Sequence, residues 1–262
     1  MAEYRFKFTY SGGVADKNRL DLYDGSVSLE GIARALTITT HAFINGEVRT
    51  RGDAANGASF YMNPSRPGSF VFEVVVWMAG AASSGLFYDF VSHSFKEAVG
   101  WSDESTRPRR ALSERIEPTM GELPAVLESP LKDVHRPIMR NPEMTLRVGR
   151  PRGEELITFD TYTGNALQPS IVNLSDPVVG HVTRYNTISR WGRFFDRSSR
   201  RVVSFFLEAG VSERERSLIT WSLHEANLNR DGSLYLYATA VTTSSGIIKR
   251  YNVSSVSDRP LP

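Results

Sequence analysis

Cysteine is absent from this chain of 262 residues. Its absence excludes a disulfide framework, a thiolate nucleophile, a cysteine-based zinc site and an iron–sulfur cluster. The five histidines also lack the close spacing of metal ligands along the chain; they are His41, His93, His135, His181 and His224. We therefore expect no metal site and no cofactor.

Long hydrophobic runs are missing as well. The longest apolar stretch, Val74–Tyr88, is interrupted by two glycines and two serines. It is shorter than the roughly 20 residues that a membrane helix needs. The first residues, Met1–Phe8, contain no apolar segment of signal-peptide length. We therefore expect a cytoplasmic protein that does not associate with membranes.

Familiar catalytic motifs are absent from the sequence. There is no phosphate-binding loop, no dinucleotide fingerprint after a predicted strand, no nucleophile elbow and no His-Glu-x-x-His zinc motif. We predict no catalytic residue and expect a non-enzymatic binding or assembly component of a larger complex. An enzyme with an unrecognised site remains an alternative.

Lysine is scarce and the basic charge is unevenly distributed. The formal net charge is +2, and only 5 of the 31 basic residues are lysine. Residues 161–262 hold 12 basic and 8 acidic side chains, whereas acidic residues slightly outnumber basic ones before them. The surplus of 12 − 8 = +4 therefore lies in the C-terminal part, which favours contact with a polyanion there.

The chain is long enough for two domains, and its pattern indicates an α+β protein. Residues 1–100 predict an N-terminal α+β domain, with alternating aromatic residues from Tyr4 to Tyr10 typical of a strand. A helix is expected from Ser28 to Asn45. Residues 101–175 are rich in proline and charge, so we predict a connector with short helices and a possible hairpin.

Residues 176–262 predict a small β-barrel. Three strand patterns precede a helix that a capping box opens at Ser212, and two strand patterns follow it. This order, β-β-β-α-β-β, is that of an OB-fold, a Greek-key barrel with a helix between its third and fourth strands. An SH3-like barrel and a small open sheet remain alternatives.

One basic and aromatic stretch forms the candidate binding site. Between Arg184 and Arg201 there are six arginines, and only Asp196 carries the opposite charge. Guanidinium groups bind phosphates and exposed aromatic rings stack on bases. The predicted binding residues are Arg184, Tyr185, Arg190, Trp191, Arg193, Phe195, Arg197, Arg200, Lys249 and Arg250.

Three interpretations of this stretch stay open. It can bind single-stranded or duplex nucleic acid, or it can dock an acidic protein partner, which would make the chain an adaptor or the subunit of an oligomer. It can also be an ordinary solvated barrel surface, because alternate residues of each strand must point into the core.

Short motifs resemble those of an uncharacterised group of bacterial two-domain proteins. They are Gly68-Ser69-Phe70 at the start of a long buried strand, Gly180-His181-Val182-Thr183, and the segment Gly246–Tyr251. The resemblance implies an N-terminal α+β domain and a C-terminal barrel-like unit. It also implies an accessory role, such as in phage defence or a mobile element, and no inherited catalytic residue.

Overall fold

The computed structural model describes residues 2–50, 55–63, 70–79, 84–101 and 109–261. The chain divides into two compact units. Unit 1 comprises residues 1–119 and 123–168, and unit 2 comprises residues 120–122 and 169–262. Gly68 and Ser69, which contribute to the resemblance, lie outside the described residues.

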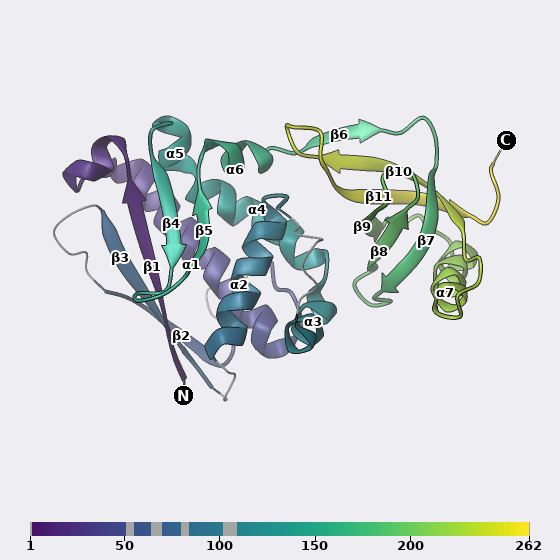
Figure 1. Cartoon of the computed structure of the whole chain (residues 1–262), viewed down its shortest axis with the longest axis horizontal. Helices are drawn as coiled ribbons and strands as arrows, with labels where there is room; N and C mark the ends of the chain where they lie inside the picture. Colours follow the sequence, from purple (N-terminus) through teal and green to yellow (C-terminus); the bar gives the residue numbers. More distant parts are fainter. Residues whose placement is uncertain (1, 51–54, 64–69, 80–83, 102–108, 262) are drawn as a thin grey trace. The chain divides into compact units, whose positions relative to one another are not determined.

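Unit 1 contains an antiparallel sheet in the order β2-β3-β1-β4-β5 (Figure 1). Its strands are β1 (Ala2–Ser11), β2 (Ala58–Asn63), β3 (Val71–Met78), β4 (Thr145–Gly149) and β5 (Glu155–Phe159). The alternation predicted for Tyr4 to Tyr10 is present in β1, where the four aromatic side chains are buried and the residues between them face away. One face of the sheet is therefore strongly apolar.

Helices supply the other side of the unit 1 core. They are α1 (Leu22–Asn45), α2 (Ser84–Ala98), α3 (Arg110–Ile116), α4 (Glu122–Val134), α5 (Arg136–Arg140) and α6 (Thr161–Ala166), with 3-10 turns at Gly13–Lys17 and Glu117–Thr119. Phe87 of α2 meets Tyr4 and Phe6 of β1 edge to face, with ring centroids 4.9 and 5.7 Å apart. The hydroxyl of Tyr88 donates to the carbonyl of Arg5 and accepts from its amide.

The first helix begins earlier than the sequence predicts. Its N-cap is Asp21, whose carboxylate accepts hydrogen bonds from the amides of Tyr23 and Asp24. Ser28, the predicted cap, is instead buried within α1 and donates to the carbonyl of Val134 in α4. The predicted end is correct, because Gly46 takes the left-handed conformation that closes the helix.

The segment predicted as a connector is largely part of unit 1, so the boundary at residue 100 is wrong. Strand β4 pairs with β1 and with β5, which confirms the hairpin within this segment. Pro137 lies in the first turn of α5, a position that tolerates proline. Pro130 lies in the interior of α4, where proline removes a backbone hydrogen bond, and its side chain is buried. Residues 102–108 of the predicted connector lie outside the described residues.

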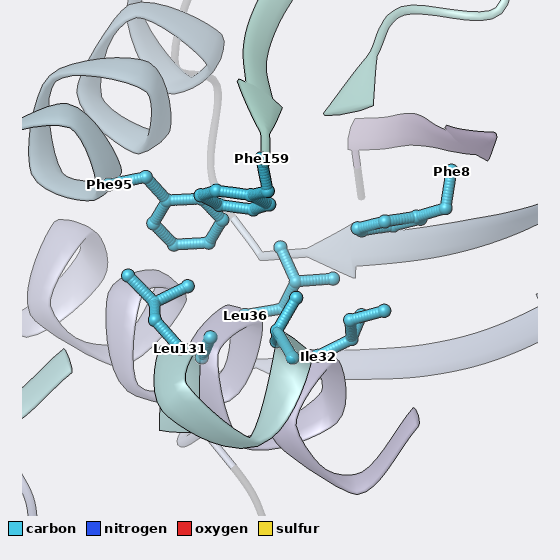
Figure 2. A pocket seen from close by; sticks show the side chains of 8 residues that line it. Phe8, Ile32, Leu36, Phe95, Leu131 and Phe159 are labelled. Atoms are coloured by element: carbon cyan, nitrogen blue, oxygen red, sulfur yellow. The ribbon is translucent and has the colours of Figure 1, made fainter. Parts of the chain in front are cut away.

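A small apolar space lies in the middle of the unit 1 core (Figure 2). Its walls are hydrophobic side chains from the sheet and from several helices: Phe8, Ile32, Ala35, Leu36, Phe95, Leu131, Val134 and Phe159. The space has no room for a water molecule and no polar wall. It is therefore a feature of core packing rather than a ligand pocket.

Unit 2 is a closed five-stranded barrel (Figure 1). Its strands are β7 (Val178–Tyr185), β8 (Trp191–Asp196), β9 (Arg201–Leu207), β10 (Leu234–Thr242) and β11 (Ile248–Ser257), with helix α7 (Glu213–Asn227) between β9 and β10. Strand β7 pairs with β8 and β10, β8 with β9, and β11 with both β10 and β9, the last in parallel. The predicted OB-like barrel is confirmed, and an additional strand, β6 (Ser170–Asn173), pairs with β10.

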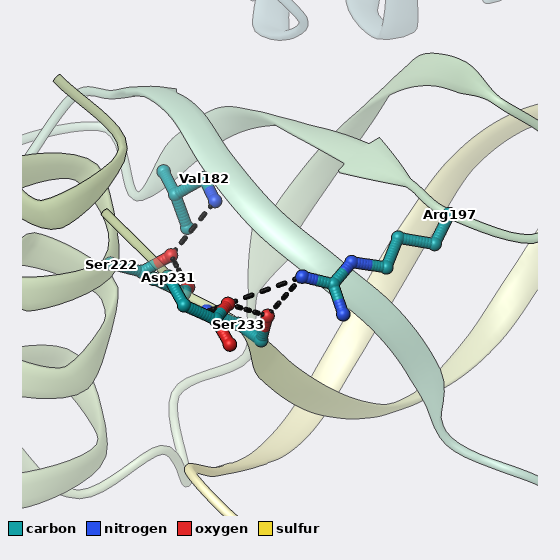
Figure 3. Close-up of polar contacts among 6 residues, drawn as sticks. Val182, Arg197, Ser222, Asp231 and Ser233 are labelled. Carbon is teal, nitrogen blue, oxygen red and sulfur yellow. Dashed lines mark hydrogen bonds and ion pairs between the residues drawn. The ribbon is translucent and has the colours of Figure 1, made fainter. Parts of the chain in front are cut away.

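Buried polar side chains join the elements of the barrel. In Figure 3 the hydroxyl of Ser222 in α7 accepts from the amide of Val182 at 3.0 Å and donates to the carbonyl of Gly232 at 2.5 Å. The carboxylate of Asp196 accepts hydrogen bonds from the hydroxyl of Tyr251 in β11 and from both serines of the β8–β9 turn. These bonds attach α7 to β7 and β8 to β11.

Glu215 holds the start of α7 against the end of β11. Its carboxylate completes the capping box with Ser212 and accepts from the hydroxyl of Ser255 and the amide of Val256. Burial alone would raise the pKa of Glu215, but these hydrogen bonds outweigh burial and lower it to about 2.

The first prediction concerns the unit 1 core. Leu36→Ala removes a fully buried side chain beside the apolar space, so the free energy of unfolding should fall by about 2–5 kcal/mol. Urea denaturation measures this change. Leu22→Ala is the control, because Leu22 is 86% exposed, and an equal loss in both variants would contradict the packing described here.

The second prediction concerns acid. Because the pKa of Glu215 is lower in the folded protein, its stabilising contribution is complete above its ordinary pKa of 4.5 and is lost as the pH falls to about 2. Glu215→Gln should weaken the hydrogen-exchange protection of β11 near neutral pH. The protection should also depend less on pH between about 4.5 and 2 than it does in the wild type. Glu213→Gln, at an exposed position in the same helix turn, should behave like the wild type.

Candidate nucleic-acid interface

The barrel has an inner face that forms its core and an outer face. Inward-pointing side chains include Val182, Phe194, Phe205 and Val253, each fully buried. Because neighbouring residues of a strand point to opposite sides, the residues between them define the outer face. We use "outer face" below for this side of β7, β8, β9 and β11.

A bulge at Thr183 decides which residues of β7 reach the outer face. Val182 pairs with Phe194, but Arg184 already pairs with Arg193, so Thr183 is an extra residue in β7. Without the bulge Arg184 would point inward like Val182. With it, Arg184 lies on the outer face beside Arg193, and Tyr185 turns inward.

Tyr185, a predicted binding residue, is half-buried and turns toward the barrel core. It pairs with the buried Gly192, stacks on Phe205 at 6.1 Å between centroids, and packs against the barrel core. Burial raises the pKa of its hydroxyl, which Arg216 and Arg190 partly oppose. No pattern in the sequence indicates the bulge that sets this orientation.

Arginines line up across the outer face. Arg184 pairs with Arg193, Arg193 with Ser204 of β9, and Ser204 with Arg250 of β11. We call Arg184, Arg193 and Arg250 the arginine row. With neighbouring strands about 4.8 Å apart, the row spans roughly 14 Å across four strands.

Aromatic side chains flank the row on the same face. Trp191 of β8 pairs with Phe206 of β9, and their rings lie 5.3 Å apart. Phe195 pairs with His181 of β7, with ring centroids 5.2 Å apart. Trp191 and Phe195 are each half-buried, and Gly121 of the same unit lies against the Trp191 ring.

The loop between β7 and β8 places Arg190 at one end of this face. The side chain of Asn186 accepts from the amides of Ile188 and Ser189, which orders the loop and leaves Ile188 93% exposed at its tip. Arg190 has a φ of 61°, a conformation that is uncommon for residues other than glycine.

The remaining predicted residues lie away from the row. Arg197 and Arg200 belong to the β8–β9 turn, and Arg200 also has a positive φ, of 54°. Arg197 contacts Asp231 at 3.2 Å and also Ser233, so it helps to hold the α7–β10 turn (Figure 3). Lys249 is the extra residue of a bulge in β11, which removes it from the alternation of the outer face.

The pKa values of two barrel residues, Asp196 and His181, are shifted by their surroundings. Burial alone would raise the pKa of Asp196, but hydrogen bonds from Ser199, Ser198 and Tyr251 outweigh it and lower the pKa. Burial lowers the pKa of His181, and Arg197 adds to that effect while Asp231 opposes it. Both shifts therefore arise from contacts within the barrel.

Metal centres and membrane-spanning helices are absent from the described residues. No group of three histidine, aspartate or glutamate side chains there is arranged to hold a metal ion. Nor is any helix in the described part of the chain long and apolar enough to cross a membrane.

Comparison with known proteins adds one finding. Residues 6–168 match the model of a family described as a domain of unknown function, DUF7946. The match ends where unit 1 ends, at Gln168. No curated protein and no solved structure matches the chain.

The third prediction tests the backbone at Arg190. Glycine adopts a positive φ without steric cost, so Arg190→Gly should leave the free energy of unfolding unchanged or raise it by up to about 1 kcal/mol. Arg193→Gly, in the regular strand next to it, should lower that free energy by about 0.5–1 kcal/mol. Thermal unfolding of the two variants gives the comparison, and a clear loss of stability in Arg190→Gly would contradict the assigned conformation.

Proposed function

The chain belongs to the DUF7946 family, whose model covers unit 1 and leaves the barrel outside it; from this division we propose that the barrel is a binding module. Its ligand is a nucleic-acid strand, held on the outer face. The chain then acts as a non-enzymatic component that brings unit 1 to a nucleic acid.

The single observation that carries this proposal is the arginine row. In an OB-like barrel, oligonucleotides bind to the face of the second and third strands and to the loops that flank it. Here those strands are β8 and β9; Arg193 of the row lies in β8, and the buried Ser204 of β9 lies between Arg193 and Arg250. Guanidinium groups bind phosphate oxygens through paired, charge-assisted hydrogen bonds.

The adjacent aromatic rings favour a single strand over a duplex. Bases of a single strand are free to stack on Trp191 and Phe195, and each stacked base contributes about 1–3 kcal/mol. In a duplex the bases already stack on one another, so the same rings would have no partner. Arg190 adds a positive charge in the loop between β7 and β8.

Arg190 also supports the proposal through its conformation. An arginine in the left-handed region costs about 1 kcal/mol compared with glycine. Strained residues concentrate at functional sites, where the side chain compensates for the strain. A phosphate contact is a function that glycine could not perform.

The fourth prediction tests the proposed function. Wild-type protein should bind fluorescein-labelled oligothymidine with an affinity that falls as salt rises, because each neutralised phosphate releases counterions. Replacing Arg184, Arg190 and Arg193 together with glutamine should make the slope of log K against log salt shallower by about 2, or roughly 0.7 for each lost contact. Fluorescence anisotropy across a salt series measures both slopes.

The matched control removes the same charge elsewhere. Arg109, Arg110 and Arg140 are exposed in unit 1, and their joint replacement with glutamine should leave the slope unchanged. Equal slopes in all three proteins would contradict the assigned surface. Absence of oligothymidine binding by the wild type at low salt would contradict the nucleic-acid ligand and favour an acidic protein partner.

A further inference from the structure

The edge strand β2 of unit 1 is unusually open to pairing. It pairs with β3 on one side, and in the described residues no strand pairs with its other side. Tyr61 and Met62 are 60% and 61% exposed. An open strand edge of this kind is a ready template for another strand.

The free hydrogen-bonding groups of β2 can be identified. The carbonyl of Gly57 accepts from the amide of Ala79 next to β3, so the odd-numbered residues of β2 direct their backbone groups toward β3. Phe60 and Met62 therefore direct their N–H and C=O groups away from the sheet. The amide of Ala58 is already used, since it donates to the carbonyl of Ala55.

The other edge of the same sheet is protected. The hydroxyl of Ser92 in α2 donates to the carbonyl of Leu156 in β5 at 2.8 Å, and β5 also carries Glu155. Strand β2 has no charged residue over its whole length, Ala58–Asn63. Natural edge strands usually carry charge or a cover that prevents pairing, and β2 lacks the charge that would repel a second copy of itself.

We propose that two copies of this chain pair through β2, antiparallel, about a two-fold axis that passes between their Tyr61 residues. The axis is perpendicular to the sheet, so the two apolar faces stay on the same side and the two sheets join into one. The interface is closed, because each copy uses the same strand and no edge is left for a third.

Register follows from the free backbone groups. With Tyr61 opposite the partner's Tyr61, Phe60 faces the partner's Met62, and Met62 faces the partner's Phe60. All the outward N–H and C=O groups of both residues are then paired, in four hydrogen bonds across the seam. A register centred on Phe60 leaves the carbonyl of Met62 opposite the amide of Ala58, which is already used.

Side chains across the seam are complementary in this register. Phe60 and Met62 share the face that packs on the helices, since they pair with Val76 and Val74 of β3, both buried. The two Tyr61 rings meet on the opposite face, where aromatic pairs stabilise antiparallel strands. Pairing therefore covers the most exposed apolar side chains of β2.

The experiment uses the absence of cysteine from the chain. In Tyr61→Cys each copy carries one thiol, and facing residues of this kind have Cα atoms about 4.5 Å apart, within the range of a disulfide. Mild oxidation of the full-length variant should give a covalent dimer on non-reducing gels. Ser59→Cys is the control: its two Cα atoms would lie roughly 14 Å apart, so about tenfold less dimer should form.

Two outcomes would overturn the proposal. One is an equal yield of covalent dimer from both variants, which would indicate random collision rather than a defined register. The other is a wild-type protein that sediments at its monomer mass of 29.3 kDa at every concentration. A wild-type dimer together with selective cross-linking through Tyr61→Cys supports the proposed interface.

Discussion

One extra residue in β7 determines what the barrel presents to its surroundings. Because Thr183 has no opposite residue in β8, the inward and outward positions exchange after it. That exchange places Arg184 beside Arg193 and moves the Tyr185 ring into the core, where it stacks on Phe205. The proposed binding surface and part of the barrel core thus depend on the same irregularity.

Buried polar groups explain why such a small barrel holds one arrangement. Asp196 receives hydrogen bonds from the β8–β9 turn and from Tyr251 in β11, and Ser222 joins α7 to β7 and to the turn before β10. A buried polar group that lost its partner would cost about 1–3 kcal/mol, so these groups disfavour alternative pairings of the strands. The same hydrogen bonds that hold the barrel together also lower the pKa of Asp196.

The sequence predicts the barrel better than it predicts unit 1. In residues 176–262 alternation, the capping box at Ser212 and the turn residues all favour the same elements, and the predicted order of three strands, a helix and two strands is that of the structure. In unit 1 the many prolines of residues 109–168 indicated a connector, although α4 has buried apolar residues along one side. The pairing of β4 with β1 joins residues far apart in the chain, and local sequence patterns do not predict such a pairing. All four arginines of the candidate site, Arg184, Arg190, Arg193 and Arg250, are among the predicted residues, but the alignment of the row across the strands depends on long-range register and on the bulge.

Closure of the barrel by β11 also sets an order of folding during synthesis. The sheet of unit 1 is complete once residue 159 has emerged, and its last helix once residue 166 has. The barrel cannot close until β11, which ends at Ser257, reaches β9 and β10. At a synthesis rate of about 5–20 residues per second, the first three barrel strands wait several seconds with open edges. A nascent chain therefore carries a folded N-terminal unit beside an aggregation-prone half-barrel, and that interval is when a chaperone would have most to protect.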